Sequence, residues 1–262
     1  MALLPAWMRN AAMPIYEQRV MKGLAGLPRP RHVGIMLDGN RRWARQMGHT
    51  DVAEGYRVGG AKAEEFLTWC AAADIGHVSL FMLSDDNVSG RPEHELVPLL
   101  RIIEDTVTGL AAPGKPWRVN VIGSLDLLPG EHAAALKEAA AATAGRTGPQ
   151  VDVAIGYGGR REIVDAVRTA FRQHIDAGGD PAEFADRIDI EDISANLYSA
   201  AGADATDLVI RTSGEQRMSG FLLWQSAYSE FHFVDVYWPA FRRVDFLRAL
   251  RSYAERDRRY GK

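Results

Sequence analysis

The stretch HVGIMLDGNRRW (32–43) decides the fold class of this 262-residue chain. Its first six residues form a short apolar run, which predicts a strand buried on both faces. The run ends at Asp38, and Gly39 allows a tight turn directly after it. Working outward from this stretch, similar apolar runs occur at 77–83, 117–123, 151–157, 207–212 and 231–236.

Helical patterns separate these runs. They cover about 55–73, 92–110, a segment after Pro129, 160–175, 190–199 and 243–259. Apolar strands that alternate with helices predict an α/β fold with a central, mainly parallel six-stranded sheet covered by helices. In such a sheet, ligands bind beyond the carboxyl ends of the strands.

Length and composition indicate one compact domain over residues 1–262, with 47% hydrophobic residues. We expect residues 1–28 to form an N-terminal arm and 243–262 a C-terminal helix and tail. The net charge of −3 lacks the basic excess of a nucleic-acid binder. Cys70 is the single cysteine, so an intrachain disulfide is excluded.

Hydropathy predicts no transmembrane helix, because the chain has no apolar run of about 18 residues. We therefore expect a cytoplasmic location. The N-terminal arm has an amphipathic pattern that suits either packing on the body or peripheral contact with a membrane.

Polar segments follow four of the predicted strands. Each taken alone is compatible with an ordinary polar turn, but together they have the composition of a phosphate and metal site. A carboxylate such as Asp38 can hold a hard cation, and the planar fork of an arginine can grip phosphate. The segments are 38–42, 84–87, 156–160 and 211–219.

Several other phosphate and metal motifs are excluded. No Walker A loop occurs, and the glycine-rich segment at 156–160 has Arg161 where GxGxxG requires its last glycine. The DDxxD motif fails at Ser89. The seven histidines show no zinc-binding spacing.

In order and spacing, these segments resemble the cis-prenyltransferase (undecaprenyl diphosphate synthase) family, most closely its actinobacterial short-chain (2Z,6E)-farnesyl diphosphate synthases. The matching pieces are residues 32–43, the loop 84–92, the turn 156–160 and DLVIRTSGEQRMSGFLLWQSAYSE (207–230). The resemblance implies a homodimer with a hydrophobic tunnel. It also implies a Mg²⁺-dependent joining of isopentenyl diphosphate to an allylic diphosphate, with geranyl diphosphate as the expected primer.

The resemblance also implies roles for individual residues. Asp38 would coordinate Mg²⁺ at the diphosphates, Glu230 would supply a second metal ligand across the dimer, and Asn87 would help to remove the proton. The implied substrate-binding residues are Gly39, Asn40, Arg41, Arg42, Trp43, Ser84, Asp85, Asp86, Arg91, Arg211, Arg217, Met218 and Ser219, together with Arg259 and Gly261 of the tail.

Some positions depart from the family pattern. Asp86 stands where the family usually has glutamate, and Val88 replaces an aromatic residue. Tyr56 stands where a histidine is often found, and Gln216 where some members carry a metal-associated histidine. The contacts of the 84–91 loop therefore stay open, and a head-to-middle condensation of the lavandulyl type is an alternative.

Met82 bears on product length. Long-chain members have a small residue at the matching position, so a methionine there would fill space that a longer isoprenoid needs. This predicts a product of about C15. The alternative is that Met82 is an ordinary core residue in a medium- or long-chain (decaprenyl or undecaprenyl) synthase. A third hypothesis is a non-catalytic partner subunit, but the retained Asp38 and arginines argue against it.

Overall fold

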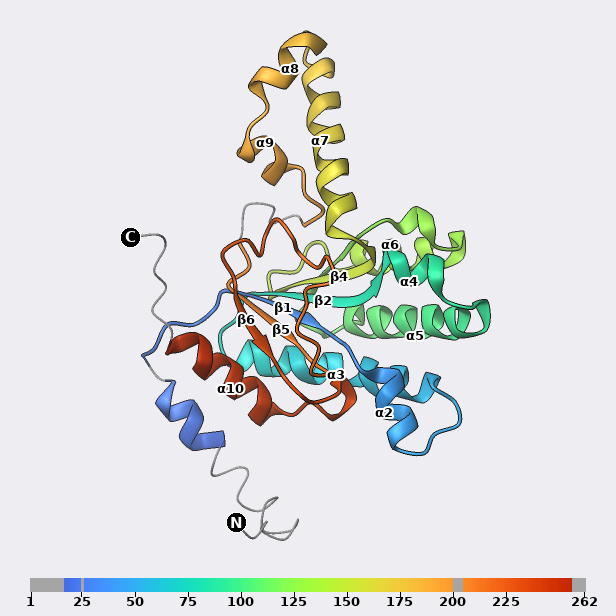
Figure 1. Ribbon diagram of the computed structural model, residues 1–262, viewed down its shortest axis with the longest axis vertical. Helices are drawn as coiled ribbons and strands as arrows, with labels where there is room; N and C mark the ends of the chain where they lie inside the picture. Colours follow the sequence, from blue (N-terminus) through green and yellow to red (C-terminus); the bar gives the residue numbers. More distant parts are fainter. Residues whose placement is uncertain (1–16, 25, 200–204, 256–262) are drawn as a thin grey trace.

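The computed structural model of the chain describes residues 17–24, 26–199 and 205–255. Its centre is a six-stranded sheet in which every pairing is parallel (Figure 1). The predicted α/β fold with a mainly parallel sheet is therefore confirmed. In spatial order the strands are β3 (Arg118–Ile122), β4 (Gln150–Tyr157), β2 (His77–Ser84), β1 (His32–Met36), β5 (Leu208–Arg211) and β6 (Glu230–Phe233).

The main core lies on one face of this sheet. Val33 and Ile35 of β1 are fully buried in it, together with side chains from the long helices. These helices are α3 (Ala53–Ala72), α5 (Glu93–Ala111), α6 (Gly130–Ala141) and α10 (Arg243–Ala254).

A smaller core lies on the opposite face, because successive residues of a strand point to opposite sides. Met36 packs there with Phe221 and Leu222. A Cβ at Gly34 would lie 3.1 Å from each of these two side chains. The glycine therefore lets the segment after β5 pack closely on β1.

An arm of three helices projects from the body (Figure 1). It consists of α7 (Gly159–Asp176), α8 (Pro181–Arg187) and α9 (Ile190–Ala195). Asp189 starts α9 through a capping box with Asp192. The predicted helix over 190–199 is thus too long, and α8 is an addition to the prediction. Helix α8 is short and has only Asp180 as a capping signal, so its sequence has too little periodicity to be detected.

Two segments predicted as polar loops are short helices. Gly39 has φ 101° and precedes α2 (Asn40–Gln46). The Ser84 side chain caps α4 (Asp85–Gly90) by accepting a hydrogen bond from the backbone N of Asn87 at 3.1 Å. The predicted site residues of both segments therefore lie on first helical turns after strands.

Strand β2 is irregular near its end. Its pairing with β4 shifts register between Phe81 and Leu83, so Met82 has no partner in β4. Strict alternation of side chains therefore fails at Met82. Strand β6 ends at Phe233 rather than 236, since the chain turns away there.

The N-terminal end of the described chain lies beside α10, and the C-terminal end directly follows this helix (Figure 1). Residues 17–23 are helical, and Val20 and Leu24 of this part of the arm are buried in the main core. Helix α10 ends at Ala254 instead of about 259. Within 17–24, 26–199 and 205–255, no helix is both long and apolar enough to cross a bilayer.

Candidate active site

A cleft of about 640 Å³ opens at the carboxyl ends of β1, β2 and β5. Its charged lining is strongly cationic, with six arginines against two carboxylates: Arg41, Arg42, Arg45, Arg91, Arg211 and Arg217, with Asp38 and Asp86. Such a surface attracts and holds polyanions, above all phosphate groups that can accept bidentate hydrogen bonds. Most of the predicted substrate-binding residues meet here.

Asp38 lies at the centre of the charge network. Its Oδ2 accepts a hydrogen bond from Arg211 Nη2 at 2.9 Å, and its Oδ1 lies 3.2 Å from Arg42 Nη2. Partial burial disfavours the charged carboxylate, but hydrogen bonds and the charges of Arg211 and Arg42 outweigh this and hold the pKa of Asp38 below its usual value. Thr212 Oγ1 also contacts the backbone N of Asp38 at 3.0 Å. The residue is therefore a fixed, ionised carboxylate.

Arg211 is 4% exposed and reaches the cleft from the end of β5. Its Nη1 donates to Ser219 Oγ at 2.9 Å and to the carbonyl oxygen of Arg217. Its Nε is buried without a hydrogen-bond partner in the described part of the chain. Buried donors of this kind usually have an acceptor, so this nitrogen is an exception in the site.

Arg91 and Tyr56 form a second anchor at the cleft. Arg91 Nη1 donates to Tyr56 Oη at 2.6 Å, while Arg91 Nε is buried and has no partner among residues 17–24, 26–199 and 205–255. Burial is the largest cause that raises the pKa of Tyr56, so its hydroxyl stays protonated. Sequence reasoning noted Tyr56 only as a departure and missed Arg45, since isolated residues within helices give no motif.

Asn87 and Ser84 lie on the β2 side of the cleft. The Nδ2 of Asn87 donates to Ser84 Oγ at 2.7 Å. Both residues line the cleft together with Asp86, as do Gly39 and Asn40 on the β1 side. The Asn87 carboxamide, which the resemblance links to proton removal, is therefore held by Ser84, the residue that caps α4.

Three of the predicted substrate-binding residues that the structure describes lie outside this lining. The Trp43 ring stacks on His49 with 5.7 Å between the ring centroids, and Met218 packs against the smaller core.

Asp85 turns toward the 156–160 segment, where a Cβ on Gly158 would lie 2.3 Å from the Asp85 carboxylate. This segment does not line the cleft, and the backbone N of Gly159 donates to Gly220 O at 2.9 Å. Arg259 and Gly261 lie outside the described residues.

Glu230 is distant from Asp38 within one chain. It begins β6 and pairs with Leu208 at the start of β5, whereas Arg211 ends β5 at the cleft. Across the described ranges, no three His, Cys, Asp or Glu side chains are grouped as a metal site. Mg²⁺ chemistry still fits Asp38, because this ion is often held by one or two carboxylates together with substrate phosphates.

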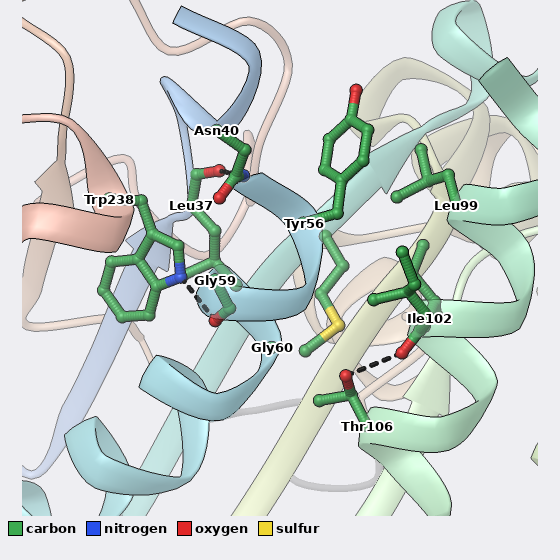
Figure 2. A pocket seen from close by; sticks show the side chains of 11 residues that line it. Leu37, Asn40, Tyr56, Gly59, Gly60, Leu99, Ile102, Thr106 and Trp238 are labelled. Atoms are coloured by element: carbon green, nitrogen blue, oxygen red, sulfur yellow. Dashed lines mark hydrogen bonds between the residues drawn. The ribbon is translucent and has the colours of Figure 1, made fainter. Parts of the chain in front are cut away.

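An inner pocket leads from the cleft toward the main core (Figure 2). The two cavities share four lining residues, namely Leu37, Asn40, Tyr56 and Met82. The inner pocket holds only about 30 Å³, which is room for about two water molecules. Its remaining lining comes mainly from α3 and α5 and is largely apolar. A cationic cleft joined to an apolar pocket suits a ligand with a diphosphate head and a hydrocarbon tail.

Comparison with known proteins agrees with this geometry. The model of the undecaprenyl diphosphate synthase (prenyltransferase) family matches residues 35–261. The chain belongs to the cis-prenyltransferase family. It is thus a prenyl transferase of the isoprenyl diphosphate synthase type, as the sequence resemblance implied.

Relatives of this cis-prenyltransferase include actinobacterial enzymes. It is 60% identical to isoprenyl transferase 2 of Streptomyces coelicolor, over 98% of this chain and 99% of the relative. It is 47% identical to (2Z,6E)-farnesyl diphosphate synthase of Mycobacterium tuberculosis, over the full length of both. A solved structure of lavandulyl diphosphate synthase from Lavandula x intermedia, in complex with dimethylallyl diphosphate, matches with a TM-score of 0.81 at 32% identity. That match covers 89% of this chain and 98% of the other.

Proposed function

We propose that this chain is a Mg²⁺-dependent short-chain synthase that condenses geranyl diphosphate with isopentenyl diphosphate to (2Z,6E)-farnesyl diphosphate. The observation that carries the proposal is the small size of the inner pocket, which shares Met82 with the cleft and holds about 30 Å³ against about 640 Å³ in the cleft. A growing isoprenoid would meet this small pocket directly behind the diphosphate site. The 47% identity to a (2Z,6E)-farnesyl diphosphate synthase supports the same product.

The reaction forms one carbon–carbon bond. The allylic C–O bond breaks, diphosphate leaves, the double bond of isopentenyl diphosphate attacks the allylic carbon, and one proton is lost. Arg42 would stabilise the leaving diphosphate, while Arg211 and Ser219 would hold isopentenyl diphosphate in line with it. Bound Mg²⁺ would neutralise charge on the leaving diphosphate, and Asp38 would hold this ion. We assign guidance of the departing proton to Asn87.

The substrate assignment is tested by incubating the purified protein with labelled isopentenyl diphosphate and dimethylallyl, geranyl or farnesyl diphosphate in turn. We expect geranyl diphosphate to give the highest kcat/KM. Chelation with EDTA should abolish turnover, and added Mg²⁺ should restore it. Turnover that persists after chelation would contradict the metal assignment.

A head-to-middle condensation is distinguished in the same assay. If the protein joins two molecules of dimethylallyl diphosphate when isopentenyl diphosphate is omitted, the head-to-tail assignment fails. We expect no product under that condition.

We also propose that the enzyme is a homodimer in which Glu230 of one copy completes the metal site of the other. The position of Glu230 at the far end of β5 from Arg211 supports this, because its own chain does not bring it to the cleft. Asp38→Asn and Glu230→Gln proteins should each be inactive, and a refolded mixture should regain activity that neither has alone. A mixture without activity would contradict the shared site.

A further inference from the structure

A surface groove continues the line of the inner pocket. The groove has a volume of about 340 Å³ and lies between α3 and α5. It shares the lining residues Gly60, Ile102 and Thr106 with the inner pocket, which in turn shares Met82 with the cleft. The cleft, the inner pocket and the groove are therefore neighbours in a row, with Met82 at the first junction and Gly60 with Thr106 at the second.

The second junction is closed by a close helix contact. A Cβ at Gly60 would lie 2.4 Å from Thr106 Oγ1. The two helices can therefore approach this closely only because residue 60 of α3 has no side chain. Thr106 Oγ1 donates to the carbonyl oxygen of Ile102 at 2.7 Å, which fixes the side chain (Figure 2). In the same view Thr106 lies toward one end of the pocket and Tyr56 and Asn40 toward the other.

The two junctions differ in stiffness. Methionine is unbranched and more flexible than threonine, but Met82 still fills the space at the first junction. Thr106 is β-branched and bonded to its own helix, and Gly60 offers no side chain to move. A chain that passes Met82 would therefore still stop at Thr106.

We propose that the Gly60–Thr106 contact is a second steric stop on product length, and that the groove beyond it accepts the isoprenoid tail once this stop is removed. The groove lining includes the small residues Gly60, Ala61 and Gly109, which leave space for a hydrocarbon chain. It also includes the charged residues Arg57, Glu64 and Asp105. The inference rests on the proposed synthase function and adds a specificity-determining residue to it.

The test compares products of the wild type and the variants Met82→Ala, Thr106→Ala and Met82→Ala/Thr106→Ala, made from geranyl and isopentenyl diphosphates and sized by mass spectrometry. Thr106→Ala alone should leave the product unchanged, because Met82 still acts first. Met82→Ala should add a few units and then stop, and the double variant should add more. Equal products from Met82→Ala and the double variant would overturn the proposal.

Met82→Ala/Thr106→Val is the matched control. Valine keeps the shape of threonine and replaces its hydroxyl with a methyl group, so this variant should give the same product as Met82→Ala. If valine lengthens the product as much as alanine does, the volume of Thr106 is not the stop and the proposal fails.

A binding series tests the stop separately from catalysis. Saturated alkyl diphosphates of increasing length are titrated into Met82→Ala and the double variant. Affinity should level off with length in Met82→Ala but continue to rise in the double variant, by roughly tenfold or more for the longest chains, because each further methylene is buried. Parallel curves for the two proteins would overturn the stop. Absence of turnover in all the proteins would count only against the proposed condensation.

Discussion

Arg211 Nη2 lies 2.9 Å from Asp38 Oδ2, although 173 positions separate the two residues. The fold causes this contact, since β5 lies beside β1 and Arg211 is in register with Met36. Arg42 approaches the same carboxylate from α2 at 3.2 Å. The fold itself therefore assembles these charges at the cleft.

Asp38→Asn should lower kcat by about 10²–10³-fold, the usual range for a group that stabilises charge in the transition state. The amide keeps the size of the side chain but loses its charge and affinity for Mg²⁺. Asp74→Asn is the control, because Asp74 is an exposed residue in the turn after α3. An active Asp38→Asn enzyme would contradict the central role of this carboxylate.

Arg211→Met should move the acid limb of kcat/KM to higher pH. Asp38 must be ionised to act, so activity falls as the pH drops through its pKa. Hydrogen bonding and charge from Arg211 help to hold this pKa below its usual value, so the pKa rises when Arg211 is removed. Arg211→Lys keeps the positive charge and should shift the acid limb of kcat/KM less than Arg211→Met does. An acid limb that stays in place in both variants would contradict this reading.

Tyr56→Phe should lower kcat/KM about tenfold, the effect of losing one hydrogen bond to a charged group. Phenylalanine keeps the ring at the mouth of the inner pocket but leaves Arg91 Nη1 without its acceptor at 2.6 Å. Tyr228→Phe serves as control, because Tyr228 is 76% exposed. If Tyr56→Phe retains the wild-type kcat/KM, Tyr56 does not position Arg91.

Gly39→Ala should reduce the free energy of unfolding by about 2–4 kcal/mol, measured by urea denaturation. A Cβ here would lie 2.6 Å from Tyr237 Cδ1 at φ 101°. Gly48→Ala is the matched control, since Gly48 has φ 80° and nothing within 4 Å. It should cost only about 1 kcal/mol of backbone strain. Equal losses of unfolding free energy in the two variants would show that Tyr237 moves away from the new Cβ at no energetic cost.

The parallel sheet could be predicted because β1, β2 and β5 lie in largely apolar runs that end at a polar residue. Asp38, Ser84 and Arg211 end three such runs, so their meeting at one edge follows from the fold class. Short helices were harder. The segments at 40–46 and 85–90 have one or two turns each, which gives too little periodicity to separate a helix from a loop.

Other features depend on contacts that no local pattern contains. The register shift at Met82 arises from the pairing of β2 with β4. The Arg91–Tyr56 hydrogen bond joins a residue after α4 to one in α3 across 35 positions. The closeness of Gly60 to Thr106 depends on how α3 packs against α5. A single sequence encodes these contacts only through the complete fold.

The most direct measurement is the product length of the wild-type enzyme and Met82→Ala, assayed side by side with geranyl and isopentenyl diphosphates. We predict a single C15 product from the wild type and a longer product from Met82→Ala, because in the proposed function the methionine blocks the growing chain behind the diphosphate site. A wild-type ladder that reaches C50 or beyond, or a Met82→Ala product that remains C15, would contradict the account.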